Sequence, residues 1–162
     1  MREAIMYFIT ADEGAAAKYC PHQVFYSYSD RVKSITPLEN SGRQEVLALL
    51  DLLSECGADT GTAIYIEEEV PNDTYFFTIT SEVKQQYFRE RWKAAHQAME
   101  ELQLGEFATV RPERLLSLLD DRYGNAAYSF ERGFCTMDDF IRSANVGATY
   151  YVASAAKFLY AD

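Results

Sequence analysis

Apolar runs rich in β-branched and aromatic side chains mark the strands that the sequence predicts. The first run, AIMYFIT over residues 4–10, ends at Ala11 and Asp12. Further strands are expected over residues 22–29, 60–68, 74–80 and 148–153, because their composition or alternation fits a partly buried strand. Residues 30–42 are rich in polar and turn-forming types, so we expect a loop there.

The clearest helical pattern lies over residues 44–56. Its apolar residues recur with a period near 3.6, which gives the helix one apolar face. Ser41 is the expected N-terminal cap and Gly57 the expected C-terminal cap. The residues on the apolar face are Val46, Leu49, Leu50 and Leu53, and Leu47 and Leu52 widen it.

A longer helix is expected from Thr80 or Ser81 to about Leu104, with Gly105 as its stop. Its apolar residues are spaced alternately by four and three positions, which predicts a stripe that faces the core. That stripe consists of Phe88, Trp92, Ala95, Met99 and Leu102.

Three shorter helices follow from capping signals. Asp12 is the expected cap of a helix that stops before Pro21. Pro112 predicts the first turn of a second helix. Thr136, with Asp139 three residues later, predicts a third. The elements indicate an α+β fold with a single mixed or antiparallel sheet packed against several helices, in one domain over residues 1–162.

Charge adds to this picture. The 162 residues hold 25 acidic and 15 basic residues, for a net charge of -10. An apolar content of 48% excludes a disordered chain, and no apolar run is long enough for a membrane span. The first residues lack the pattern of a signal peptide. Three widely spaced cysteines are typical of reduced thiols, so we expect a cytoplasmic protein.

The negative charge is concentrated over residues 34–73, which hold nine acidic residues against one base, Arg43. Within this segment, VPND predicts a hairpin turn between two strands. Glu67 and Glu69 would share one strand face about 6.6 Å apart. Carboxylates this close are stable when they are solvated, neutralised by a cation or matched by a basic partner. The spacing does not fit a calcium-binding loop.

An acidic protein is repelled by nucleic acids and by anionic membranes, so neither is an expected ligand. We expect instead a small protein-binding module, of the inhibitor or immunity (anti-defence) kind. Its acidic surface would act as a nucleic-acid mimic toward a basic, nucleic-acid-binding protein. Tyr65 is the expected anchor of that interface. The expected partner-binding residues are Glu45, Asp51, Glu55, Tyr65, Glu67, Glu68, Glu69 and Asp73.

A small enzyme is the first alternative. Cys20 and His22 lie two residues apart and would share one side of an extended chain, where they could form a thiolate nucleophile. Cys135 precedes a predicted helix start, where the helix dipole is expected to lower a thiol pKa. Cys56 is expected to be a buried apolar residue. Scattered carboxylates are the other catalytic candidates under this interpretation.

The sequence contains no HExxH, GxxxxGK[ST], GxGxxG or GxSxG motif. With two histidines, His22 and His96, and no CxxC pair, an ordinary zinc site is not expected. No metal, cofactor or catalytic residue is therefore assigned. His96 is expected at the surface of the long helix.

A homo-oligomer or a small-molecule sensor is the second alternative. Twelve tyrosines are present, and partly exposed tyrosine surfaces favour protein partners or self-association, including a homodimer. The run KQQYFRERWK mixes bases with aromatics, as nucleic-acid surfaces do. Because Phe88 and Trp92 align with the expected core stripe, the bases are interpreted as an ordinary solvated face.

Overall fold

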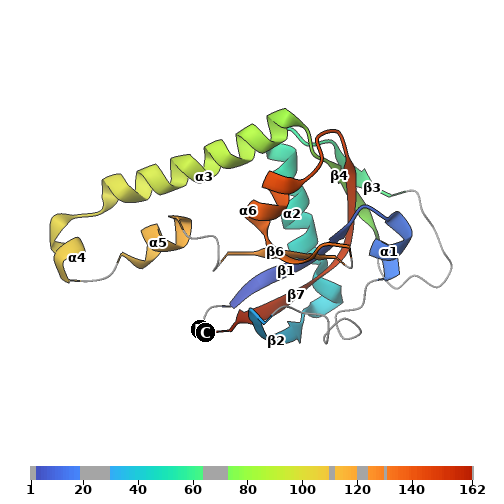
Figure 1. Ribbon diagram of the computed structural model, residues 1–162, viewed down its shortest axis with the longest axis horizontal. Coiled ribbons are helices and arrows are strands. Elements are labelled where there is room, and N and C mark those ends of the chain that lie inside the picture. Colours follow the sequence, from blue (N-terminus) through green and yellow to red (C-terminus); the bar gives the residue numbers. More distant parts are fainter. Residues whose placement is uncertain are drawn as a thin grey trace.

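The computed structural model describes residues 3–18, 30–63, 73–109, 112–119, 124–129 and 131–161, and Figure 1 shows the arrangement of these parts. They form a mixed seven-stranded sheet with helices, so the predicted α+β class is confirmed. The strands are β1 (Glu3–Thr10), β2 (Val32–Pro37), β3 (Thr60–Thr62), β4 (Tyr75–Thr78), β5 (Ala126–Ser129), β6 (Gly133–Thr136) and β7 (Thr149–Tyr160). The helices are α1 (Glu13–Lys18), α2 (Arg43–Glu55), α3 (Ser81–Glu101), α4 (Leu104–Thr109), α5 (Glu113–Leu119) and α6 (Met137–Ser143), and a 3₁₀ turn, η2 (Glu39–Gly42), precedes α2.

The sheet has the strand order β3-β4-β7-β1-β5-β6, and β2 also pairs with β7. The β1–β5 pair is parallel and the other pairs are antiparallel. The pairing of β3 with β4 agrees with the predicted hairpin, whose tip lies outside the described residues. The strand predicted over residues 22–29 also lies outside them.

Strand β7 is the centre of the sheet and is much longer than predicted. It pairs with β1 along one edge, and with β4 and then β2 along the other. The prediction stopped at residue 153 because the alanines that follow are poor strand formers. Gly42 packs directly against Ala155: a Cβ on Gly42 would lie 2.6 Å from the Ala155 carbonyl oxygen and 2.9 Å from the Ala155 Cβ. The turn before α2 therefore rests directly on β7.

The prediction of a loop over residues 30–42 is wrong, because residues 32–37 form β2 at an edge of the sheet. Edge strands tolerate proline and polar residues, so their sequences lack the apolar signature of central strands. Strand β6 was also missed. Residues 126–129 form β5, in a segment near residues 126–130 that the sequence pattern left unassigned.

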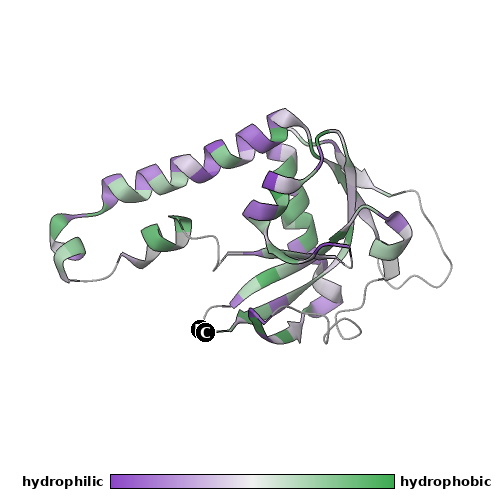
Figure 2. Ribbon diagram, viewed as in Figure 1, coloured by the Kyte–Doolittle hydropathy of each residue, from purple (hydrophilic) through white to green (hydrophobic). Residues whose placement is uncertain are grey.

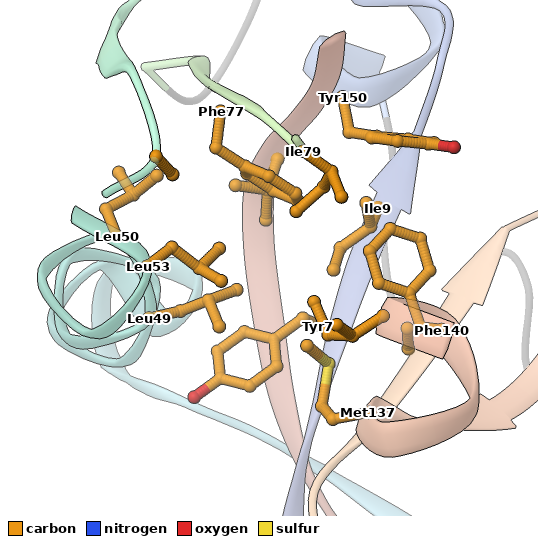
Figure 3. Close-up of a cluster of buried hydrophobic side chains, with 14 of the residues drawn as sticks. Tyr7, Ile9, Leu49, Leu50, Leu53, Phe77, Ile79, Met137, Phe140 and Tyr150 are labelled. Atoms are coloured by element: carbon orange, nitrogen blue, oxygen red, sulfur yellow. The ribbon is translucent and has the colours of Figure 1, made fainter. Parts of the chain in front are cut away.

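Buried side chains form two clusters. The larger cluster joins Tyr7 and Ile9 of β1 to residues of β4, β7, α2, α3 and α6 (Figure 3). The smaller cluster contains Met6 and Phe8, which alternate with Tyr7 and Ile9 along β1 and therefore point to the other face of the sheet. Strand β1 is thus apolar on both faces, which agrees with its continuous apolar run.

Several capping predictions are confirmed. The Asp12 carboxylate accepts from the Ala15 N–H at 3.0 Å, and the Thr80 hydroxyl accepts from Val83 N–H at 3.2 Å. The Thr136 hydroxyl accepts from the Asp139 N–H at 3.0 Å. The predicted cap Ser41 is wrong: Gly42 occupies that position, at a φ of +78°, and makes no side-chain cap.

The predicted core stripe of α3 is largely wrong. Trp92 is 64% exposed and Met99 is 54% exposed, whereas the buried residues of α3 are Val83, Tyr87 and Ala98. Figure 1 shows the reason: beyond its first turns α3 extends away from the sheet, so only its inner side meets other elements. Gly105 is not the stop, because α3 ends at Glu101 and Gly105 lies inside α4.

Figure 2 colours much of α5 and parts of α4 as hydrophobic, although α4 lies at the end of α3 that is distant from the sheet. No helix among the described residues is both long enough and apolar enough to cross a bilayer.

Candidate functional site

A cavity of about 510 Å³ opens between helices α2, α3 and α5 and the start of α6. We call it the tyrosine pocket, because Tyr7 of β1 and Tyr87 of α3 line it. Its apolar wall includes Leu49 and Leu52 of α2 and Leu118 of α5. Helix α5 contacts α3, so Leu118 of α5 and Tyr7 of β1 line the same cavity.

The polar centre of the pocket is a buried network around Asp138. The Tyr87 hydroxyl donates to Asp138 Oδ1 at 2.7 Å, and Arg91 donates to Asp138 Oδ2 at 2.7 Å. Arg91 also donates to the Leu118 carbonyl oxygen at 3.1 Å, which ties α5 to α3. The side chain of Asp138 is 10% exposed and that of Arg91 is 30% exposed. This carboxylate is thus removed from water and satisfied by two donors.

Burial sets the protonation of the two tyrosines. It raises the pKa of Tyr7 to about 12, and the negative charge of Glu45 adds to that rise. Burial also raises the pKa of Tyr87, and the neighbouring Asp138 raises that pKa further. Both phenols are therefore neutral hydrogen-bond donors at neutral pH. Tyr87 uses its proton on Asp138, whereas the Tyr7 hydroxyl has no hydrogen-bond partner among the described residues.

Figure 3 shows the Tyr7 ring packed among apolar side chains, with its oxygen at the edge of the cluster beside α2. Cys56, which follows α2, also lines the pocket, and burial raises its thiol pKa, with Glu90 as the next cause. A thiol with a raised pKa is a weak nucleophile. The pocket is therefore suited to binding a molecule rather than to thiolate chemistry.

The predicted partner-binding residues fall into three groups. Asp51 and Glu55 lie one turn apart on the exposed face of α2. Glu45 is half-buried on the side of α2 that borders the pocket, so it does not share their surface. Asp73 is exposed and forms an ion pair with Arg43 at 3.5 Å. Tyr65, Glu67, Glu68 and Glu69 lie outside the described residues.

The Arg43–Asp73 contact brings the base of the hairpin beside the start of α2. Arg43, the one basic residue within residues 34–73, therefore partly neutralises Asp73. The acidic helix α2 and the base of the acidic hairpin are thus neighbours at this point. Their combined negative charge is smaller than the count of acidic residues suggests, because Arg43 pairs with Asp73.

The thiol predictions have different outcomes. Cys20 and His22 lie outside the described residues. The prediction of a lowered pKa for Cys135 is wrong: the pKa is raised, chiefly by burial, and Asp139 adds to the rise while Arg132 opposes it. Cys56 is buried, as predicted. His96 lies at the surface, as predicted, and its ring stacks on Trp92 with centroids 5.1 Å apart.

Sequence reasoning missed the residues of the pocket. Tyr87 and Arg91 are four residues apart, so their spacing alone indicates that they share one face of α3. Asp138 lies in the first turn of α6, where an acidic residue is unremarkable. Nothing in the chain order indicates that this carboxylate meets α3, 47 positions from Arg91.

A metal site has no support in the described parts of the chain, where no group of three or more His, Cys, Asp or Glu side chains is arranged to hold an ion. Comparisons with protein-family models, with curated proteins and with solved structures found no match to this chain.

Proposed function

We propose that this protein binds a small, mainly apolar molecule in the tyrosine pocket. The observation that carries the proposal is the free Tyr7 hydroxyl, a neutral donor on the wall of an apolar cavity of about 510 Å³. Ligand pockets in proteins are usually of about 300–1,000 Å³, mostly apolar, with a few polar groups that orient the ligand. Tyr7 supplies such a group, and it is available for a ligand with a hydrogen-bond acceptor.

The charges around the pocket narrow the class of ligand. Arg91 is paired with Asp138, and Glu90, which also lines the cavity, pairs with Lys93 at 3.4 Å. Glu45 is close enough to raise the pKa of Tyr7. Acidic groups therefore outnumber basic ones, so an anion would be repelled. A neutral or cationic ligand with an apolar body fits best.

Two matched dyes test this proposal. N-phenylnaphthylamine is neutral, and anilinonaphthalene sulfonate is the same ring system with one negative charge. Fluorescence titration is expected to show saturable binding of the neutral dye, at about one per chain, and clearly weaker binding of the sulfonate. Ala48 lines the pocket, so Ala48→Phe fills part of it and is expected to weaken binding at least roughly tenfold.

The matched control is Leu47→Phe, which places the same ring one residue away, on the exposed side of α2. Because exposed apolar helices also attract dyes, binding that Ala48→Phe leaves unchanged would lie outside the pocket. That result, or a preference for the sulfonate, would contradict the proposal.

The docking of a basic protein is a second proposal. Its support is the Arg43–Asp73 contact, which brings the hairpin base beside α2, together with the exposed carboxylates of Asp51 and Glu55. Reversing Glu67, Glu68 and Glu69 together is expected to abolish capture of a basic protein from nuclease-treated lysate at low salt. Circular dichroism would check that the fold is kept. Capture that survives the reversal would exclude this tip as the interface.

An enzymatic role for Cys20 and His22 stays a prediction. Its test is the loss of an activity in Cys20→Ala or His22→Ala without a loss of stability.

A further inference from the structure

A second cavity, of about 270 Å³, opens at the carboxyl ends of two neighbouring strands, and we call it the strand-end cavity. Strands β1 and β5 are parallel, so both of these ends lie at the same edge of the sheet. Thr10 ends β1, Ser129 ends β5, and both line the cavity. In open sheets, the carboxyl ends of parallel strands are a common place for ligands to bind. This cavity shares no lining residue with the tyrosine pocket.

The apolar wall of the strand-end cavity belongs to the core. Ile9, Phe140 and Tyr150 line it, and each is at most 5% exposed. The rings of Phe140 and Tyr150 pack edge to face, with centroids 5.1 Å apart. Cavities that hold drug-sized ligands are usually of about 300–1,000 Å³. The strand-end cavity lies just below that range, so it suits a smaller molecule with a short apolar group.

Glu131 supplies a negative charge at the end of β1. It lies in the turn between β5 and β6, is exposed, and lines the cavity. The buried Thr10 hydroxyl donates to Glu131 Oε1 at 2.6 Å, which fixes the carboxylate beside β1. Glu131 Oε2 accepts no hydrogen bond from the described residues, so it is available to a cationic donor.

Arg132, the next residue, supplies a positive charge on the side of α6. Its Nη2 donates to the Ser143 carbonyl oxygen at 3.2 Å and also to the Ser143 hydroxyl. Its guanidinium carbon lies 5.6 Å from the centre of the Phe140 ring. A guanidinium has five N–H donors, and those on Nε and Nη1 meet no acceptor in the described parts of the chain. Glu131 and Arg132 thus contact different elements rather than each other, and both charges line one cavity.

Two buried hydroxyls also line the cavity and keep a proton to donate. The Tyr150 hydroxyl accepts from the Asn145 N–H at 3.0 Å, and the Ser129 hydroxyl accepts from the Arg132 N–H at 3.0 Å. Neither proton has an acceptor among the residues that the structure describes, although Tyr150 is only 5% and Ser129 only 4% exposed. Figure 3 shows the Tyr150 oxygen at the end of the ring that points away from Phe77. A buried donor without an acceptor is costly, and a ligand acceptor would remove that cost.

We propose that the strand-end cavity binds a small zwitterion of the α-amino-acid class, with an apolar side chain. The ligand carboxylate accepts from Arg132 and from the Tyr150 hydroxyl, and the ligand ammonium group donates to Glu131. The apolar side chain packs on Ile9 and Phe140. A ligand that lacks one charge leaves Glu131 or Arg132 unmatched, so tight binding needs both charges. This site does not depend on a ligand in the tyrosine pocket.

Leucine and two of its analogues test the charge requirement. Isoamylamine is leucine without the carboxylate, and isocaproate is leucine without the ammonium group. Isothermal titration of the full chain is expected to show saturable binding of leucine, at about one per chain. Each analogue is expected to bind at least roughly tenfold more weakly, because a hydrogen-bonded charge is lost.

Glu131→Gln and Arg132→Gln each remove one charge and keep nearly the same shape. Each is expected to weaken leucine binding at least roughly tenfold. The matched controls are Asp139→Asn and Arg142→Gln. Arg142 also lies over a ring, that of Phe88 at 5.0 Å, and pairs with Asp139 at 2.7 Å, but neither residue lines the cavity. Both controls are expected to leave leucine binding unchanged, and melting temperatures would check that every variant is folded.

Ala48→Phe separates this site from the tyrosine pocket, which it partly fills. It is expected to leave leucine binding unchanged. Leucine binding that Ala48→Phe removes, and that Glu131→Gln and Arg132→Gln leave intact, would assign the ligand to the tyrosine pocket and overturn the proposal. Two other results would also overturn it. One is the absence of saturable binding of leucine, valine or alanine at millimolar concentration. The other is an analogue with a single charge that binds as tightly as leucine.

Discussion

Replacing Asp138 by alanine tests how much the buried network of the tyrosine pocket stabilises the protein. The change leaves the Tyr87 hydroxyl, in a residue only 7% exposed, without its acceptor. A buried donor that loses its partner costs about 1–3 kcal/mol. Arg91 also loses its carboxylate, but it is 30% exposed and keeps the Leu118 carbonyl, so we discount this loss to about 1 kcal/mol. The expected loss of unfolding free energy is about 2–4 kcal/mol.

The neighbouring residue provides the control. Asp139 pairs with Arg142 at 2.7 Å, the same distance as Arg91–Asp138, but its side chain is 56% exposed. Asp139→Ala is expected to cost only about 0.2–1 kcal/mol. Both variants remove one acidic residue from the first turn of α6, so any effect on the helix dipole is shared.

Urea denaturation measures both variants. With a slope of about 2 kcal/mol per molar urea, Asp138→Ala is expected to lower the midpoint by about 1–2 M, and Asp139→Ala by a few tenths of 1 M. Equal and small losses in the two variants would refute the reasoning, because burial is the difference between the two pairs.

Three further predictions follow from single residues. The pKa of Tyr7 in the folded protein, about 12, lies above its ordinary value of 10, so the protein should lose up to about 3 kcal/mol of stability as pH rises from 10 to 12. Tyr7→Phe cannot ionise and should not show this loss, which urea denaturation of the two proteins at each pH measures. Gly42 and Gly133 both have positive φ, but only at Gly42 would a Cβ meet other atoms; Gly42→Ala should therefore cost more than Gly133→Ala, which should cost about 1 kcal/mol, and equal melting temperatures would contradict this. The thiols of Cys56 and Cys135 should react with a disulfide reagent more slowly at pH 8 than a small free thiol, because burial raises the pKa of both; fast reaction of either in the native protein would contradict the assignment.

Local pattern predicted much of the secondary structure. The caps at Asp12, Thr80 and Thr136, the α2 helix and the apolar β1 strand each depend on residues close together in sequence, and each is confirmed. Strand β2 was missed, because an edge strand needs no apolar pattern of its own and depends on β7, more than a hundred residues away.

The residues of the candidate site could not be predicted from local sequence pattern. Tyr7, Tyr87, Arg91 and Asp138 come from β1, α3 and α6, and their pKa shifts and contacts result from burial against one another. The acidic residues that composition emphasised are mostly exposed or outside the described residues. Charge is visible in a sequence, whereas desolvation is a property of the folded chain.

The sequence by itself determined that α2 and α3 each carry an apolar face. The tertiary structure decided which of those faces the chain covers. Val83, Tyr87 and Ala98 of α3 are buried against other elements, whereas Trp92 and Met99, which the pattern placed in the core, are exposed. The physical reason is that periodicity reports where apolar surface lies on a helix, but burial requires another surface within contact distance, and only the path of the whole chain sets that distance.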